Sequence, residues 1–199
     1  MTGFVLLALI PVLVGVVVGY ALGGRLSALA GRFRALWLLW LAAAVQASQY
    51  YAAGPRALIE DRLGIPMLGI VFGLVAAWLA VNVGGWPPMM RAAAGVVIAG
   101  AALNASVIAA NGRMPYAPPA AAEVGLPAAA TTAKNEPADA DTRLAFLGDV
   151  MAVPVLNKVI SVGDVLIGVG TAVLVAAAMR RETSTPEPST TIHHDGGTP

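Results

Sequence analysis

The strongest constraint on the fold is how unevenly charge is distributed along the chain. Five stretches of about 20 residues carry almost no Asp, Glu, Lys or Arg: residues 4–22, 35–53, 66–84, 92–110 and 159–179. Only the last of them contains a charged residue, Asp164. A helix needs about 20 apolar residues to cross the ~30 Å hydrocarbon core of a bilayer, because each residue adds about 1.5 Å. The sequence therefore predicts an all-α, polytopic transmembrane bundle of about five helices.

The composition agrees with a lipid bilayer as the main partner of this chain. Charged residues make up 12% of the 199 residues, against roughly 25% in a typical soluble domain. We therefore expect one transmembrane domain over residues 1–180. The net charge of +1 lacks the basic surplus that nucleic-acid binding needs, so no nucleic-acid partner is expected. Because cysteine is absent, disulfides and cysteine-ligated metals are excluded.

The positions of Lys and Arg predict the orientation, because short cytoplasmic loops are enriched in these residues. Basic residues gather in the first connection, in the third connection and after the fifth apolar stretch: Arg25, Arg32, Arg34, Arg91, Arg180 and Arg181. We expect a multi-pass protein of a bacterial plasma membrane, with its N-terminus outside. Residues 181–199 are then a disordered cytoplasmic tail.

Two further segments lie between the fourth and fifth predicted helices. Residues 115–142 are rich in Ala, Pro and Thr with scattered charges, which predicts a flexible outer loop. Residues 144–158 are apolar but are interrupted by Asp149, Pro154 and Lys158. This segment is too interrupted to cross a bilayer, so we expect a short interfacial or re-entrant helix.

Polar side chains near the outer ends of the predicted helices form the candidate site. Residues three or seven positions apart share one face of a helix, so two pairs of amides are each expected on one face. The cluster comprises Gln46, Gln49, Asn104, Asn111, Arg113, Asp149, Asn157 and Asp164. It predicts a water-filled pocket, an ion pair of Arg113 with Asp149 or Asp164, or hydrogen bonds that hold the helices together.

The two aspartates allow a structural and a functional interpretation. Ser161 and Asp164 have the spacing of a helix capping box, and Asp149 is placed to cap the short apolar helix. Alternatively, both carboxylates face a polar cavity. The run from Ser161 to Asp164 resembles the G-x-G-D motif of intramembrane aspartyl proteases and prepilin peptidases, in which paired aspartates activate water. Here a serine replaces the first glycine, and we expect no catalytic residue, metal or cofactor.

Three short motifs occur in a fixed order around the last two predicted helices. They are Asn111-Gly112-Arg113-Met114-Pro115, Leu147-Gly148-Asp149 and Ser161-Val162-Gly163-Asp164. Together they resemble an uncharacterised family of small bacterial membrane proteins with a domain of unknown function, over roughly residues 1–180. The resemblance implies a multi-helix bacterial membrane protein and brings no assigned activity.

Clustered polar residues without a catalytic set favour a non-enzymatic binding or accessory component. Its partners would be another protein or a second copy of the chain. The main alternative is a small cation- or proton-coupled transporter that uses Asp149 and Asp164. A weaker alternative is a membrane hydrolase with an aspartate dyad.

Overall fold

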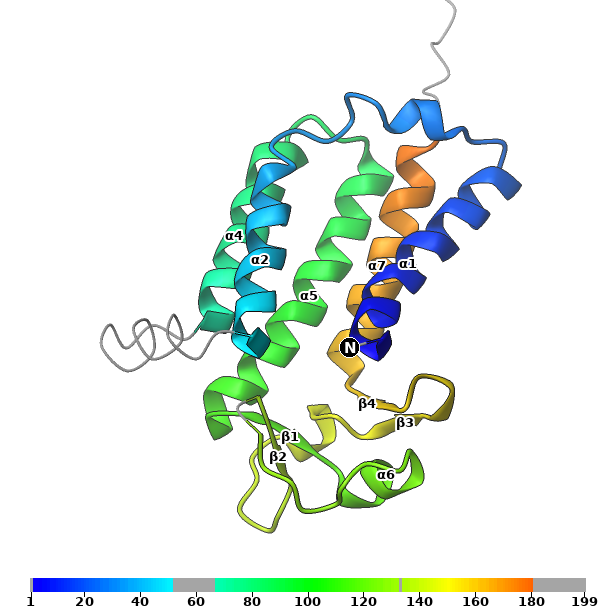
Figure 1. The fold of residues 1–199 in the computed structure, drawn as a ribbon. Coiled ribbons are helices and arrows are strands. Elements are labelled where there is room, and N and C mark those ends of the chain that lie inside the picture. The colour runs from blue at the N-terminus through cyan, green and yellow to red at the C-terminus, as the bar shows by residue number, and fades with distance from the viewer. Residues whose placement is uncertain (1, 52–66, 133, 181–199) are drawn as a thin grey trace, which may run out of the picture.

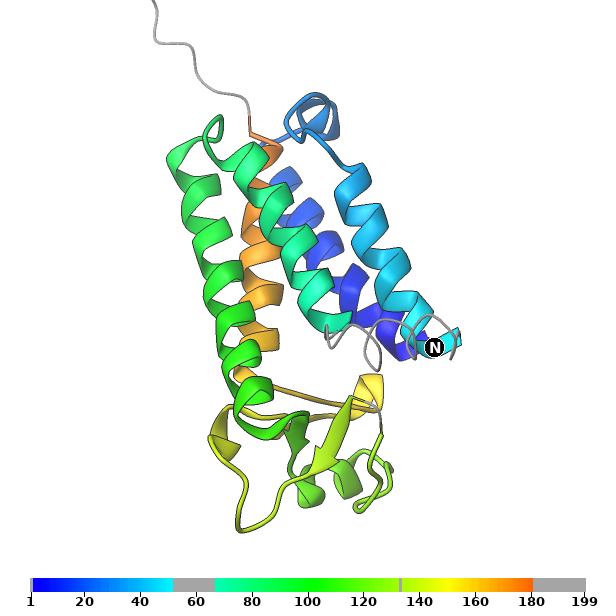
Figure 2. The ribbon, with the colours of Figure 1, turned by 90° about the vertical axis from the view of Figure 1, so that its left-hand side faces the viewer.

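Five long helices lie side by side, and a cap of short elements covers one end of them (Figures 1 and 2). The computed structural model describes residues 2–51, 67–132 and 134–180. These described residues are mostly helical and form six α-helices and two small sheets. The expected all-α class is therefore corrected to a mostly helical fold with small sheets.

The five long helices coincide with the five apolar stretches. They are α1 (Thr2–Ala21), α2 (Trp37–Tyr51), α4 (Met67–Val83), α5 (Pro88–Asn111) and α7 (Val162–Ala178). Within the described residues, only α5 is long and apolar enough to pass as a membrane span by itself, and the other apolar helical stretches have 10–17 residues. Three predicted segments lie outside the described residues: the last two residues of the second helix (52–53), the first residue of the third helix (66) and the tail (181–199).

The ends of α5 show how local sequence sets the length of the longest helix. Pro88 occupies the first turn, where its missing N–H has no partner within a helix. Gly112 ends the helix with a φ of 85°, a left-handed conformation that favours glycine. The chain then turns into the cap.

The cap contains the short elements between α5 and α7. Strand β1 (Met114–Tyr116) pairs in parallel with β2 (Asn135–Pro137), and the small helix α6 (Pro118–Glu123) lies between them in sequence. Strands β3 (Met151–Val153) and β4 (Lys158–Ile160) form an antiparallel hairpin. Single 3-10 turns precede the hairpin and form its loop: η3 (Ala145–Leu147) and η4 (Pro154–Leu156). A further turn, η1 (Leu26–Leu29), lies at the opposite end of the bundle.

The cap is more structured than the sequence predicted. Residues 115–142, predicted as a flexible outer loop, contain most of β1 and all of α6 and β2. Residues 144–158 form no α-helix: they contain η3, β3, η4 and the start of β4, and Leu144 and Asn157 turn the chain with φ of 52° and 48°. The interruptions in this apolar stretch mark turns and a hairpin.

Helix α7 is central, because it packs against α5 on one side and α1 on the other, whereas α2 packs mainly against α4. Glycines allow the close approaches. A Cβ atom on Gly15 of α1 would lie 2.5 Å from the carbonyl oxygen of Ala172. A Cβ atom on Gly100 of α5 would lie 2.5 Å from the carbonyl oxygen of Gly163. Larger side chains at these positions would push the helices apart.

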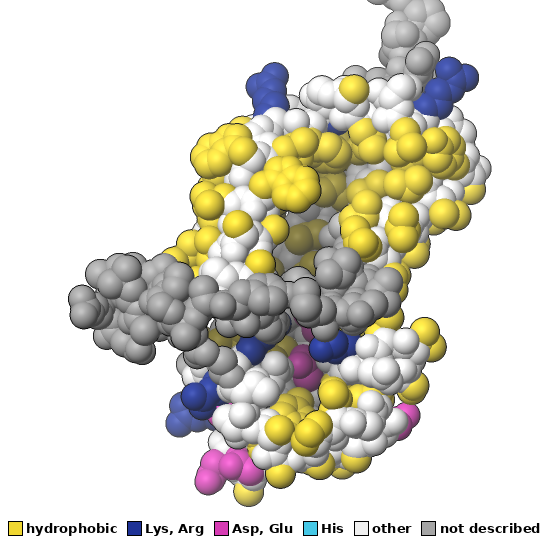
Figure 3. All heavy atoms as spheres, viewed as in Figure 1, with side chains coloured by type: hydrophobic (Ala, Val, Ile, Leu, Met, Phe, Trp, Pro, Cys, Tyr) yellow, Lys and Arg dark blue, Asp and Glu magenta, His cyan; other side chains and the backbone are white. Residues whose placement is uncertain are grey.

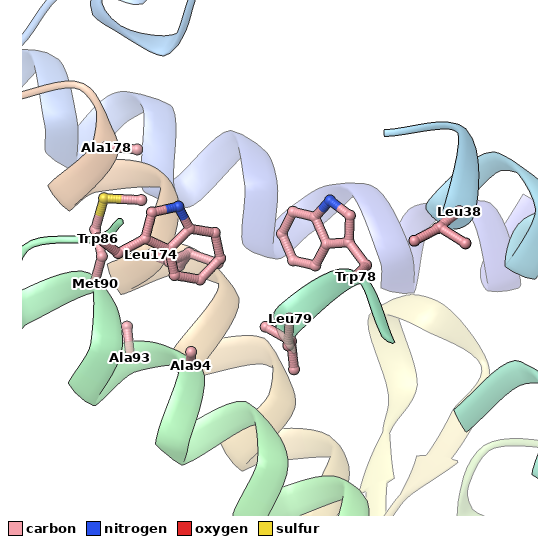
Figure 4. Close-up of a cluster of buried hydrophobic side chains, with 9 residues drawn as sticks. All are labelled: Leu38, Trp78, Leu79, Trp86, Met90, Ala93, Ala94, Leu174 and Ala178. Carbon is pink, nitrogen blue, oxygen red and sulfur yellow. The ribbon is translucent and has the colours of Figure 1, made fainter. Parts of the chain in front are cut away.

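A buried apolar cluster joins the α2–α4 pair to α5 and α7 at the end away from the cap (Figure 4). Trp78 and Trp86 have ring centroids 5.5 Å apart, and the Phe33 ring lies 5.8 Å from each, tilted to Trp78 and edge-on to Trp86. Buried Asn82 fixes the connection before α2, because its side chain exchanges hydrogen bonds with the backbone N–H and carbonyl of Arg34. The cluster comprises Leu38, Trp78, Leu79, Trp86, Met90, Ala93, Ala94, Leu174 and Ala178.

Candidate functional site

The candidate site lies where the cap meets the C-terminal end of α5 and the N-terminal end of α7. We call this region the cap junction and define it by Asn104, Asn135, Asp149, Ser161 and Asp164. Figure 3 shows acidic and basic side chains gathered in the hollow between the helices and the cap, below a surface dominated by apolar side chains.

A closed set of hydrogen bonds ties the start of α7 to α5. The Ser161 hydroxyl accepts a bond from the backbone N–H of Asp164 at 3.0 Å, and the Asp164 carboxylate accepts one from the backbone N–H of Ser161 at 3.1 Å. This reciprocal pair confirms the predicted capping box. Asn104 connects it to α5: its amide donates to Asp164 at 2.9 Å, and its carbonyl accepts from the Ser161 hydroxyl at 2.9 Å.

Glycine makes this connection sterically feasible. Gly163 lies two residues after the cap residue Ser161, and a Cβ atom there would overlap the Asn104 side chain. Ser161 is fully buried and Asn104 is 8% exposed, so their polar atoms would be costly to leave without partners. The arrangement therefore explains three of the motif positions, Ser161, Gly163 and Asp164, by packing and capping.

Asp149 lies in the cap and does not cap a helix, contrary to the prediction. Its backbone N–H donates to the carbonyl of Pro115 at 2.8 Å, and its carbonyl accepts from the N–H of Ala117 at 2.9 Å. Its carboxylate accepts a hydrogen bond from the side chain of Asn135 at 2.9 Å. A Cβ atom on Gly148 would lie 2.5 Å from the Pro115 carbonyl oxygen. The Leu147-Gly148-Asp149 motif therefore packs directly against the end of the motif that runs from Asn111 to Pro115.

The environment of Asp149 favours its protonated form. Burial, and after it the nearby Asp164 carboxylate, raise the pKa of its carboxyl group from 3.8 to a net value of about 7. The pKa is lowered by the charge of Lys134, by the hydrogen bond from Asn135 and by the charge of Lys158. Asp149 can therefore exchange a proton near neutral pH.

Asn111 and Arg113 organise the cap next to this group. The Asn111 side chain accepts from the N–H of Arg143 and donates to its carbonyl, both at 2.8 Å, which holds the segment before η3 against the end of α5. Arg113 forms an ion pair with Glu136 at 3.5 Å. In place of the predicted pairing of Arg113 with Asp149 or Asp164, this ion pair joins the residue before β1 to β2.

The remaining predicted residues lie elsewhere. Asn157 is exposed in the loop of the β3–β4 hairpin, where its φ of 48° suits an asparagine. Gln46 is half-buried on α2, and Gln49 lies on the same helix with its side chain outside the described part. Sequence reasoning missed Lys134 and Asn135, because nothing local in the 115–142 segment indicated that β2 would return to β1.

An apolar groove begins at the cap junction and runs between α1 and α7. Its volume is about 570 Å³, and Asp164 is the one charged side chain among its lining residues in the described chain. The β3–β4 hairpin contributes Leu156 and Ile160 to its lining. The other lining residues are Ile10, Pro11, Val14, Val165, Ile167, Gly168, Val169, Thr171 and Ala172.

The described residues offer no metal centre, since no group of three His, Asp or Glu side chains converges among them. In comparisons with known proteins, one family model matches residues 31–176, and it describes a family of unknown function (DUF5317). No curated protein and no solved structure matches the chain.

Proposed function

We propose that this chain, which belongs to the DUF5317 family of unknown function, is a multi-pass membrane protein that acts as a non-enzymatic binding component. The binding site is the cap junction on the outer side of the membrane. One observation carries this proposal: the described acids of a largely apolar molecule, together with the amides of Asn104 and Asn135, gather at one end of the bundle, beside an open apolar groove.

The surface of the helices supports lipid as their solvent. Val17 is 67% exposed, Leu13 is 60% exposed and Trp40 is 77% exposed. Large apolar patches of this kind are unfavourable in water but are the normal outer surface of a membrane bundle. The 17 residues of α7 extend about 25 Å, and a bilayer thins or helix-flanking residues adapt to such a mismatch at modest cost.

The segregation of charge supports an outer cap. Five arginines lie at the end of the bundle opposite the cap, namely Arg25, Arg32, Arg34, Arg91 and Arg180. All described acidic residues lie in the cap or in the first turn of α7. Because positive charge is retained in the cytoplasm, the arginine end is cytoplasmic and the cap is outside.

The hydrogen bonds of the two aspartates support binding over hydrolysis. The Asp164 carboxylate is held by Asn104 and the Ser161 backbone, and the Asp149 carboxylate is held by Asn135. A dyad that activates water needs two carboxyl groups sharing one proton around a water molecule. These carboxylates instead connect separate elements of the fold.

Single-cysteine labelling tests the topology, and the cysteine-free sequence makes it clean. Ala140→Cys in the cap and Ala30→Cys at the arginine end are both at exposed positions. A membrane-impermeant maleimide should label Ala140→Cys on intact cells and should label Ala30→Cys only after permeabilisation. Labelling of Ala30→Cys on intact cells, or recovery of the chain in the soluble fraction, contradicts the proposal.

Isolation from mild detergent tests the non-enzymatic role. A bound molecule or second chain should copurify with the protein. Recovery of a monomer that has no bound molecule or partner chain and that turns over a substrate would contradict the non-enzymatic role.

A proton- or cation-coupled carrier is the second candidate, and the pKa of Asp149 near 7 beside Asp164 favours it. The close packing of α5 against α7 at Gly100 and Gly163 weighs against a path for ions between these two helices. In proteoliposomes, Asp149→Asn should abolish proton-dependent flux if the protein is a carrier. Unchanged flux removes this group from any transport mechanism.

A further inference from the structure

The groove between α1 and α7 has the dimensions of a site for one lipid chain. It extends along α7 from Asp164 to Ala172, which is eight residues or about 12 Å of helix. One leaflet of a bilayer contributes about 15 Å of hydrocarbon. The volume of about 570 Å³ falls in the range of roughly 300–1,000 Å³ that is usual for small-molecule sites.

The polar end of the groove has the charge to select a headgroup. Asp164 lies at the first turn of α7, so its carboxylate stands where the apolar lining meets the cap. Each of its oxygens accepts one protein hydrogen bond, from Asn104 and from the Ser161 backbone. A carboxylate offers about four lone-pair sites, so acceptor positions remain for an external donor.

A second charge lies close to the same end. Lys158 on β4 falls between Leu156 and Ile160 in sequence, and both of these residues line the groove. Alternate residues of a strand share one face, which puts Lys158 on the same face as Ile160. Lys158 does not itself line the groove, but its charge acts on Asp149, so a positive charge stands at the cap junction near the Asp164 end of the groove.

We propose that the groove binds a phospholipid with a primary amine in its headgroup, an inference that rests on the proposed membrane location. One acyl chain lies between α1 and α7. The headgroup ammonium donates to the Asp164 carboxylate, and the phosphate lies toward Lys158. A phospholipid with a glycerol headgroup leaves the carboxylate without a counter-charge and binds more weakly.

Lipid retention by the purified full-length protein tests this assignment. The protein is exchanged into micelles that contain equal amounts of phosphatidylethanolamine and phosphatidylglycerol, and the retained lipid is identified by native mass spectrometry. Loss of one charge-assisted contact corresponds to a preference of roughly tenfold, which we expect in favour of the amine lipid. Asp164→Asn should reduce that preference to near unity.

A pair of valine variants keeps the test independent of the capping role of Asp164. Val165 and Val173 are both on α7 and are 40% and 38% exposed, but only Val165 lines the groove. Val165→Trp should fill the groove and lower retention of both lipids several-fold, whereas Val173→Trp should retain them as the unchanged protein does. Equal retention by the two tryptophan variants, or no preference in the unchanged protein, overturns the inference.

The outcome is separable from that of the proposed function. If the labelling of Ala140→Cys and Ala30→Cys gives the expected topology while lipid retention is unselective, the lipid assignment alone is wrong. If the chain is recovered without a membrane, both proposals are wrong.

Discussion

Asp149 is held where ionisation is unfavourable. In the unfolded chain its carboxyl group has a pKa near 3.8, and in the folded cap burial and the Asp164 carboxylate raise that pKa to about 7. Between these two values the folded state binds more protons than the unfolded state. The contribution to stability is therefore fully present below about pH 4 and is lost as pH rises to about 7.

Replacing Asp149 with Asn should remove this pH dependence. The amide oxygen still accepts the hydrogen bond from Asn135 but carries no charge to bury. Because each pKa unit corresponds to about 1.4 kcal/mol, the stability of Asp149→Asn relative to the unchanged protein should rise by up to a few kcal/mol between pH 5 and pH 8. Thermal unfolding in one detergent at both pH values measures the difference.

The exposed Asp141 supplies the control for this experiment. Asp141→Asn removes a carboxylate from the same cap without touching the junction, so its pH profile should follow that of the unchanged protein. If Asp149→Asn loses stability equally at pH 5 and pH 8, the carboxyl group is not held in its protonated form.

At the scale of elements, the start of α7 depends on a single hydroxyl group. Ser161 caps the helix and donates to Asn104, so Ser161→Ala removes a cap and leaves a buried amide oxygen without a donor. We expect a loss of about 2–3 kcal/mol in the free energy of unfolding. Ser106→Ala, on the exposed face of α5, is the matched control and should change stability little. Comparable losses in the two variants would contradict the role given to the capping network.

The apolar stretches located the long helices because an uncharged run of helical length leaves few alternatives. The predicted first residues of two helices were wrong, in each case because of the local sequence. Helix α5 begins at Pro88, four residues before the expected start, because the charge of Arg91 excluded its first turn from the apolar run. Helix α7 begins at Val162 and not at residue 159, because the residues before Ser161 pair as β4.

The cap was not predictable in the same way. Its strands have three residues each, too few to show an alternating pattern, and β1 pairs with a β2 that lies about 20 residues further along the chain. The contact of Asp149 with Asn135 depends on that pairing. The capping box was recognisable because its residues are local, whereas its link to Asn104 was not, since Asn104 lies 57 residues from Ser161.

At the scale of the whole molecule, two groups of helices are joined at one end. The group of α1, α5 and α7 meets the α2–α4 pair chiefly through the buried apolar cluster at the arginine end (Figure 4). Trp86 occupies its centre: it is 5% exposed, its ring packs against Phe33 and Trp78, and its indole N–H donates to the Arg32 carbonyl at 3.2 Å. The Trp86 side chain therefore holds together the segment between α1 and α2, helix α4 and helix α5.

Trp86→Ala should weaken the attachment of the α2–α4 pair to the rest of the bundle. Truncating a buried tryptophan costs about 3–5 kcal/mol, because apolar contacts are lost and a cavity remains. The unfolding temperature in detergent should fall accordingly, and α2 and α4 should show faster hydrogen exchange than α5 and α7. Trp40→Ala provides the control, because Trp40 is 77% exposed on the outer face of α2 and its removal leaves no cavity. Equal destabilisation by the two substitutions would mean that the helix groups are held together elsewhere, and uniform exchange in all helices would mean that the bundle unfolds as one unit.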